Sequence, residues 1–222
     1  PSTVSIVEYV LDKRRQQPAG YFRPSGFGGC DRNNVYHYRR EPEELPQHDN
    51  RMWKILDIGT RLHDLFQKDY FSEHPDILFV PEPKVEGLLG PLRARVQGHA
   101  DGVLIRRSDG YRWLLEIKTK SPAAFKSLKE PEPSHVWQVT LYARLLGLHW
   151  ASIYYFCKGS NAVKEFQVEV TDKQWDKAVK RATHLKMYVD NGTLPKYDEN
   201  TCSKKFCRWV ERCGKDPDGW NS

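Results

Sequence analysis

An Asp-Gly pair at residues 109 and 110 separates two strand-like runs that carry two carboxylates and a lysine. Such a pair between alternating strands predicts a β-hairpin with a two-residue turn. That turn places Asp101 opposite Lys118 and makes Glu116 a diagonal neighbour of Asp101 on the same face of the sheet. The hairpin therefore gathers two acids and an ammonium group.

Two carboxylates on one sheet face repel each other unless a cation lies between them. Diagonal neighbours lie roughly 7 to 8 Å apart by backbone position, which suits one or two Mg²⁺ or Mn²⁺ ions, and a lysine beside them can assist an attacking water or a developing phosphate charge. The alternative is that Glu116 and Lys118 are ordinary exposed strand residues. Leu114, Leu115 and Ile117 argue against it, because they make the strand look buried on both faces.

The elements that must position these residues follow from hydrophobic periodicity and breakers. Ser134 and Asp172 are the expected N-caps of two helices. The order of elements predicts an α/β fold, a mixed β-sheet flanked by helices. The expected helices span residues 4–16, 26–40, 49–71, 134–146 and 172–190, and the expected strands span 77–85, 92–96, 100–107, 111–118, 151–157 and 163–170.

Composition favours a polyanionic partner. The 222 residues carry 35 Lys and Arg against 29 Asp and Glu, a formal charge of +6. The printed sequence has neither an apolar run long enough for a membrane span nor the apolar core of a secretory signal. We therefore expect a cytoplasmic protein with no membrane partner; the oligomeric state stays open.

Cysteines form the second group with possible chemistry. Four of the five lie outside the middle of the chain, and in a reducing compartment this favours metal ligation over disulfides. Cys157, in an apolar strand, is expected to be a small core residue. The four others are Cys30, Cys202, Cys207 and Cys213.

Four short motifs occur in order along the chain, on the expected element types. Together they resemble the GxxxH, GxxD, ExK and QxxxY motifs of RecB-type nucleases in the PD-(D/E)XK superfamily, over roughly residues 25 to 215. The resemblance implies a restriction-endonuclease-like fold. The motifs are Gly59 to His63, Gly98 to Asp101, Glu116 to Lys118, and Gln138 to Tyr142.

The resemblance also implies roles. His63, Asp101, Glu116 and the carbonyl of Ile117 would hold Mn²⁺ or Mg²⁺, with Lys118 catalytic beside them, although a lone helical histidine is more often a packing residue. Gln138 and Tyr142 share a helix face and would support the site and the DNA; the alternative is a buried tyrosine with a hydrogen-bonded glutamine. His99 and His135 are further candidates for a phosphate contact.

The four outlying cysteines resemble the ligands of the iron-sulfur branch of that family, which includes CRISPR-associated and phage-encoded exonucleases. A [4Fe-4S] cluster would join the amino-terminal helix to the tail. The tail spacing here is C-x4-C-x5-C, where the family usually has two residues between its first tail cysteines. Zinc held by four thiolates is therefore the alternative.

The sequence thus predicts a single domain over residues 1–222. Residues 25–75 form a helical segment with Cys30 and His63, residues 77–170 the catalytic sheet, and residues 172–222 a helix and cysteine tail. The expected function is a metal-dependent exonuclease acting on single-stranded DNA or DNA with free ends, with recombination or CRISPR adaptation proteins as partners. The alternatives are a structure- or site-specific endonuclease and a catalytically silent DNA-binding module.

Overall fold

The computed structural model describes residues 20–43, 61–63, 65–71, 73–202, 204 and 207–216. In these residues a five-stranded mixed sheet has the order β1-β4-β5-β6-β7, and a two-stranded sheet pairs β2 with β3. The predicted α/β class with a helix-flanked mixed sheet is confirmed. The strands are β1 Ile77–Pro81, β2 Lys84–Leu89, β3 Ala94–His99, β4 Gly102–Arg106, β5 Arg112–Lys120, β6 Trp150–Cys157 and β7 Val163–Glu169.

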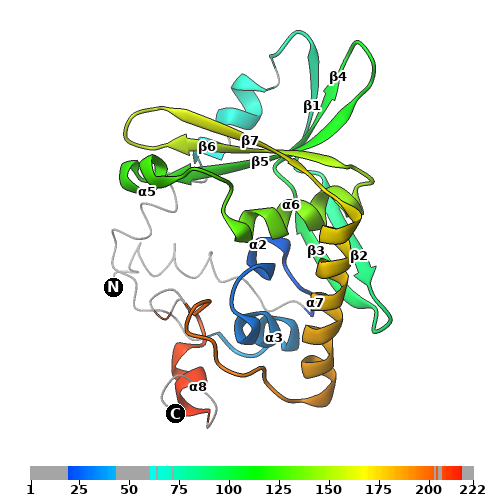
Figure 1. Cartoon of the computed structure of the whole chain (residues 1–222), viewed down its shortest axis with the longest axis vertical. Coiled ribbons are helices and arrows are strands. Elements are labelled where there is room, and N and C mark those ends of the chain that lie inside the picture. Colours follow the sequence, from blue (N-terminus) through cyan, green and yellow to red (C-terminus); the bar gives the residue numbers. More distant parts are fainter. Residues whose placement is uncertain are drawn as a thin grey trace, which may run out of the picture.

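Helices cover both faces of this sheet and flank the lower ribbon (Figure 1). Helix α6 packs on one face, the short π-helix η1 on the other, and the long α7 runs beside β2 and β3. The helical elements are α2 Pro24–Phe27, α3 Asp31–Arg39, η1 Phe66–Tyr70, α5 Pro122–Ser127, α6 Pro133–Leu145, α7 Asp172–Asn191 and α8 Val210–Lys215.

Strands β1 and β2 continue one another, as do β3 and β4, in a single antiparallel ribbon that bends. Pro81 pairs with Gly102 and Lys84 with His99, and the bonds Glu82 N to Asp101 O and Ala100 N to Pro83 O keep the same register between them. Beyond the bend the ribbon leaves the main sheet and runs down toward α3 (Figure 1). Strand β5 therefore loses its β4 neighbour at the level of Asp101.

The pairing of β4 with β5 differs from the predicted hairpin by two residues. Ile105 pairs with Arg112, whereas the expected two-residue turn would pair it with Leu114. The turn is longer because Gly110 N donates to Arg106 O and the Asp109 carboxylate accepts from Arg106 and from the amide of residue 111. Side chains alternate with a period of two, so this error keeps every residue on its predicted face.

Two predicted helix N-caps are wrong, by two residues at α6, where Glu132 is the N-cap, and by one at α7. Helix α6 begins at Pro133, which suits the first helical position because its φ is fixed and it lacks an N–H, so Ser134 lies inside the helix. Thr171, not Asp172, caps α7, in a capping box with Gln174. Gly192, with φ +71°, ends that helix as expected.

The expected helix over residues 26–40 is broken in two, and one helix was not expected. Gly28 ends α2 against α6, where a Cβ would lie 2.8 Å from the Cα of Ser134. Helix α5 was missed; Ser121 caps it and accepts from Ala124 N. The expected helix 4–16 and most of the helix 49–71 lie outside the described residues.

Three apolar clusters set the faces of the sheet. Leu114, Ile153 and α6 residues such as Val139 form the first, on the α6 face. Leu115 and Ile117 pack on the opposite face with Phe66 of η1. A third cluster joins α2, α3, α7 and the β2-β3 ribbon. None of the described helices combines the length and apolarity that a bilayer crossing requires.

Candidate active site

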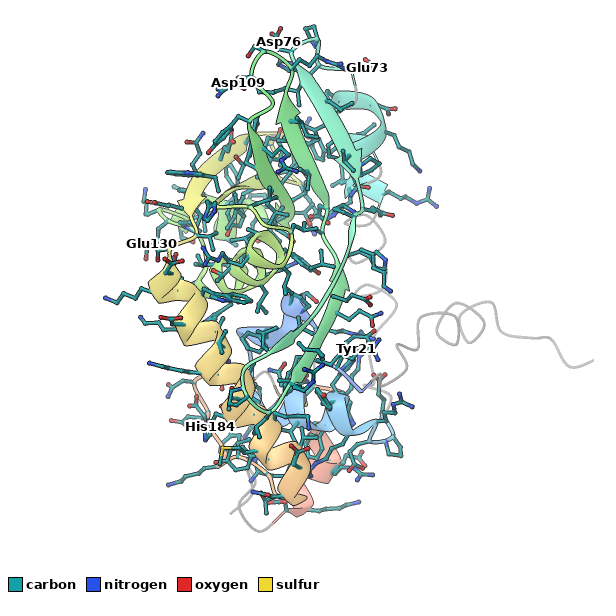
Figure 2. All side chains as sticks on the ribbon, turned by 90° about the vertical axis from the view of Figure 1, so that its right-hand side faces the viewer. Tyr21, Glu73, Asp76, Asp109, Glu130 and His184 are labelled. Atoms are coloured by element: carbon teal, nitrogen blue, oxygen red, sulfur yellow. The ribbon has the colours of Figure 1, made fainter. Side chains whose placement is uncertain are left out.

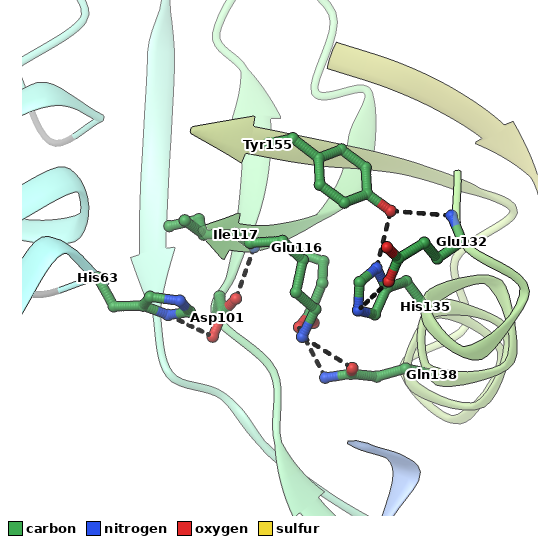
Figure 3. A network of polar contacts seen from close by, with 9 residues as sticks. His63, Asp101, Glu116, Ile117, Glu132, His135, Gln138 and Tyr155 are labelled. Atoms are coloured by element: carbon green, nitrogen blue, oxygen red, sulfur yellow. Dashed lines mark hydrogen bonds and ion pairs between the residues drawn. The ribbon is translucent and has the colours of Figure 1, made fainter. Parts of the chain in front are cut away.

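The candidate site lies where the β3-β4 strand leaves β5. Asp101 stands just before β4, so it comes level with Glu116 instead of Lys118, and its Oδ2 accepts a 2.6 Å bond from the amide of Ile117. The bend of the ribbon leaves that amide without a backbone partner on this side, and the carboxylate replaces the missing ladder bond. The same bond fixes Asp101 beside β5 (Figure 3).

A helical segment brings a histidine and a glutamine to Asp101. His63 Nδ1 lies 3.3 Å from Asp101 Oδ1, and Gln67 Nε2 donates to the Asp101 carbonyl at 2.9 Å. Phe66, between them in the chain, is buried against Ile117 and Leu115 and so holds this segment on the sheet. The predicted approach of His63 to the acids is therefore present, although Gly59 of the same motif lies outside the described residues.

Glu116, Lys118 and Gln138 form a closed polar triangle. Lys118 Nζ lies 2.6 Å from Glu116 Oε1, Gln138 Nε2 donates to the same oxygen at 2.6 Å, and Lys118 donates to Gln138 Oε1 at 3.0 Å. Glu116 is only 1% exposed. Its other oxygen, Oε2, is buried and has no hydrogen-bond partner among the described residues.

Tyr142 lies one turn beyond Gln138 on α6 and is buried. Its hydroxyl bonds to the Gln138 side chain, and burial followed by the charges of Glu116 and Asp101 raises its pKa. Glycine is needed at position 98 because a Cβ there would lie 2.7 Å from the Tyr142 hydroxyl oxygen. Gln138 and Tyr142 thus form a buried, bonded pair that supports Glu116 and Lys118.

Burial and mutual charge set the protonation of the site. Burial raises the pKa of Glu116 to about 7, with the Lys118 charge opposing and the Asp101 charge adding to the rise. Burial disfavours the charged forms of Lys118 and His63, but neighbouring carboxylates outweigh it and the pKa of each is raised. Lys118 therefore stays protonated, and its charge, with the bonds from Lys118 and Gln138, offsets part of the cost of burying the Glu116 carboxylate.

A second polar group continues the same face of β5. Lys120 forms an ion pair with Glu132. His135 Nδ1 lies 2.7 Å from the hydroxyl of the buried Tyr155 (Figure 3). Burial, with Lys118 and Lys120, lowers the pKa of His135 to about 3, so its ring is neutral. The other histidine singled out in the sequence, His99, is exposed at the end of β3.

The four outlying cysteines lie at the start of α3 and in the tail, and in the part of the chain that the structure describes no metal cluster is evident among them. Burial raises the pKa of Cys30 to about 11, and the charges of Cys202 and Cys207 add to it. Burial raises the pKa of Cys207, and the charges of Cys202 and Cys213 add to the rise. Arg32 donates to Cys213 Sγ at 3.7 Å. All are free thiols, and Cys157 is buried in β6, apart from them in sequence.

Sequence reasoning placed Gln138 at the site but did not predict its bonds to both Glu116 and Lys118. It missed the contact from Gln67 and the ion pair of Lys120 with Glu132. A pattern of two residues along β5 would have pointed to Lys120, since it shares a face with Glu116 and Lys118. Across the described residues no group of three or more His, Cys, Asp or Glu side chains is arranged to hold a metal ion as it stands.

No protein-family model and no curated protein matches this chain. Solved structures do match. The protein SSO0001 aligns with a TM-score of 0.60 at 17% identity, over 95% of this chain and 96% of its own. An alkaline exonuclease, LHK-Exo from Laribacter hongkongensis, aligns with a TM-score of 0.56 at 13% identity, over 83% of this chain and 93% of its own. The structure of LHK-Exo in complex with dAMP aligns with a TM-score of 0.56 at 13% identity, over 79% of this chain and 90% of its own. At these identities the likeness shows the fold.

Proposed function

We propose that this chain is a divalent-metal-dependent deoxyribonuclease that hydrolyses phosphodiester bonds at DNA ends. The observation that carries the proposal is Glu116, a buried carboxylate bonded to Lys118 on one oxygen and unpartnered on the other. Asp101 lies level with it on the neighbouring strand. Two acids and a lysine on one sheet face are what metal-assisted attack on a phosphodiester requires.

The fold supports the same reaction class. LHK-Exo, which shares the fold, is an alkaline exonuclease and has been solved with dAMP, a nucleotide with one phosphate. Fold alone carries many functions. The argument therefore stands on the side chains, and the likeness adds the choice of DNA and of its ends over other phosphate esters.

The donor set fits Mg²⁺ or Mn²⁺. A buried carboxylate oxygen without a donor is costly, and a cation would remove that cost. Glu116, Asp101 and His63, with the Ile117 carbonyl, would be the ligands of one or two ions, since carboxylate and carbonyl oxygens with an imidazole suit these metals. The bound ion supplies Lewis-acid stabilisation of the charge that develops on the phosphate.

The chain's own residues provide orientation and a positive charge. An ammonium group has three donors; Lys118 directs two at Glu116 and Gln138, and the third is available for a phosphate oxygen. Gln138 keeps both charged groups in place. Water attacks phosphorus, the ester bond breaks, and the two products carry a phosphate and a hydroxyl.

The test is cleavage of end-labelled single- and double-stranded DNA with Mn²⁺ or Mg²⁺, using anaerobically purified protein. We expect Glu116→Gln to lower the rate by about 10³-fold, because it removes the buried charge while keeping the shape. Glu86→Gln is the matched control, since Glu86 is half exposed on β2. Wild-type cleavage by the Glu116→Gln protein would overturn the proposal.

The same substrates separate the rival functions. An endonuclease would cut covalently closed circular DNA as fast as linear DNA, whereas an exonuclease requires an end. A silent binding module would retain DNA without cutting it under any metal condition. The intact Asp101, Glu116 and Lys118 set favours a catalyst, because a binding module needs no unpartnered buried carboxylate.

We also propose that Cys30, Cys202, Cys207 and Cys213 bind a [4Fe-4S] cluster, with zinc as the alternative. Burial raises the pKa of Cys30 and of Cys207, and the charges of neighbouring tail cysteines add to both rises, which supports a shared site. Arg32 donates to Cys213 Sγ at 3.7 Å. A cluster supplies four iron-thiolate bonds that tie α3 to the tail.

Metal analysis and visible absorption test this assignment. Iron with labile sulfide that disappears in Cys207→Ser but persists in the Cys157→Ala control supports the cluster. Zinc without iron identifies the alternative, and neither metal bound to anaerobically prepared protein rejects both.

A further inference from the structure

The face of the main sheet opposite α6 carries an aromatic hollow. It has a volume of about 390 Å³, within the range of small-ligand sites. It lies at the β4-β5 turn, and Figure 2 places that turn, marked by Asp109, at one end of the molecule. Its main walls are Arg106, Tyr111, Trp113, Trp150, Ser152 and Gln167.

Strand geometry explains why these side chains meet. Trp113 alternates with Leu115 and Ile117, which pack on the η1 face, so it points away from Glu116 and Lys118. In the parallel register of β5 and β6, Leu114 pairs with Ala151, so Trp113 and Trp150 lie level on adjacent strands. The η1 cluster reaches the carboxyl half of these strands through Tyr154 and Phe156, and the amino half carries the hollow.

The rings stay open to solvent. Tyr111 is 41% exposed and Trp150 37% exposed, and Tyr111 and Trp113 have centroids 5.9 Å apart with planes inclined by 32°. Monomeric proteins seldom expose grouped aromatic rings without a use for them. Their arrangement provides flat π surfaces beside one another.

The edges of the hollow are polar. Arg106 lies 5.2 Å from the centre of the Tyr111 ring and is held there by both oxygens of Asp109. Ser152 and Gln167, which face each other on β6 and β7, supply a hydroxyl and an amide. Flat rings with a guanidinium and an amide at the rim match a nucleobase, which has π faces and a hydrogen-bonding edge.

We propose that this hollow binds an unpaired nucleobase by stacking, as a site distinct from the catalytic carboxylates. The inference rests on the proposed action on DNA, and its ligand is a base of a single-stranded segment. Exposed Arg107 and Arg112 flank the turn and provide positive charge for the backbone of that segment. Because the hollow and Glu116 lie on opposite faces of the β-sheet, a DNA strand bound at both must pass around the sheet.

The experiment measures binding of short labelled oligonucleotides by fluorescence anisotropy and tryptophan quenching, in the Glu116→Gln background without added metal. We expect Trp150→Ala to weaken binding of single strands and of duplexes with overhangs about tenfold, since stacking of one base has that order of effect. Trp150→Phe should restore most of the affinity. The matched control is Met187→Ala on α7, which is 48% exposed.

Two further arms define the ligand. Blunt duplex should bind equally to wild type and Trp150→Ala, because paired bases cannot enter the hollow. A free nucleoside monophosphate tests whether the base alone suffices, and Trp150-dependent quenching by it also supports base stacking. With active protein, a dinucleotide too short to reach both faces should be cleaved equally by Trp150→Ala and wild type.

Unchanged single-strand affinity in both Trp150→Ala and Tyr111→Ala would overturn the inference, and an equal loss for blunt duplex would reject base stacking. If these variants bind DNA normally but lose binding to a protein, the hollow is a protein-docking site, and this result would also overturn the inference. Failure of cleavage with Trp150-dependent single-strand binding intact would reject the catalytic proposal alone.

Discussion

The sheet face that carries the proposed active site and the cysteine region are held together in different ways. Glu116 and Lys118 lie within a strand that is hydrogen-bonded along its length to β6, and Asp101 is tied to that strand by the Ile117 amide. The cysteines lie between α3 and a tail that regular backbone pairing does not join. Long side chains bridge them instead.

Arginines provide those bridges. Arg32 donates to Pro195 O at 2.8 Å and pairs with Asp216, Arg212 pairs with Glu41, and Arg208 with Glu43. Ladder hydrogen bonds cooperate along a sheet, whereas side-chain bridges each order a long stretch of chain at an entropic cost. The comparison teaches that backbone pairing positions the proposed catalytic carboxylates, whereas the tail depends on side-chain bridges and would gain most from the proposed cluster.

The largest effect is expected at the proposed active site. Lys118→Met should lower the rate of DNA cleavage by about 10³-fold, because it removes the ammonium from the phosphate and from Glu116. The protein should still fold, since methionine fills the same volume. Lys126→Met, on exposed α5, is the control. Rates within threefold of wild type would show that Lys118 has no catalytic role.

The second prediction concerns the contacts of α3 with the tail. Arg32→Met should lower the free energy of unfolding by about 3 kcal/mol, because it removes the buried guanidinium that bonds the Pro195 carbonyl and pairs with the partly exposed Asp216 carboxylate. Hydrogen exchange should rise in α8 and α3 and stay unchanged in β5 and β6. Equal exchange increases in the sheet would contradict the separate stabilisation of the two regions.

The third prediction concerns Gln138, which bonds to both Lys118 and Glu116. Gln138→Ala should reduce kcat about tenfold to a hundredfold with little change in KM, because the side chain positions Glu116 and Lys118 rather than DNA. It should also shift the pH dependence of kcat, since Gln138 donates to Glu116. Gln138→Glu should not restore activity. A change confined to KM would instead indicate a DNA contact.

The fourth prediction concerns the dependence of stability on pH in the region of α3. Burial, with the charges of Arg23 and Arg208, lowers the pKa of His37 to about 4 in the folded protein, from an unfolded value of 6.5. Between these values the unfolded chain binds a proton that the folded protein excludes, so stability falls as pH falls from about 6.5 to 4.

The slope from this one group is at most about 1.4 kcal/mol per pH unit. His37→Asn should flatten the curve in that window when unfolding by urea is followed at several pH values. The matched control is His184→Asn on α7, because His184 lies on the helix surface away from Arg23. An unchanged slope in His37→Asn would show that other groups control acid stability.

Periodicity in the sequence was sufficient for most elements of the sheet and for α6 and α7, because each buries one continuous face. It failed at the β4-β5 turn, where the Asp109 carboxylate closes a longer loop than the Asp-Gly pair predicts. It also failed at Gly28, where the break between α2 and α3 depends on the closeness of α6. These details depend on neighbours distant in sequence.

Residue types and alternation along a strand, which is local, were enough to predict the charged side chains of β5 and the face on which they lie. The bend of the ribbon at Asp101, the bonds of Gln138 to the charged pair, and the hollow lined by Trp113 and Trp150 depend on long-range packing. The physical reason is that burial and hydrogen bonding between distant segments arise only when the sheet and α6 are packed together.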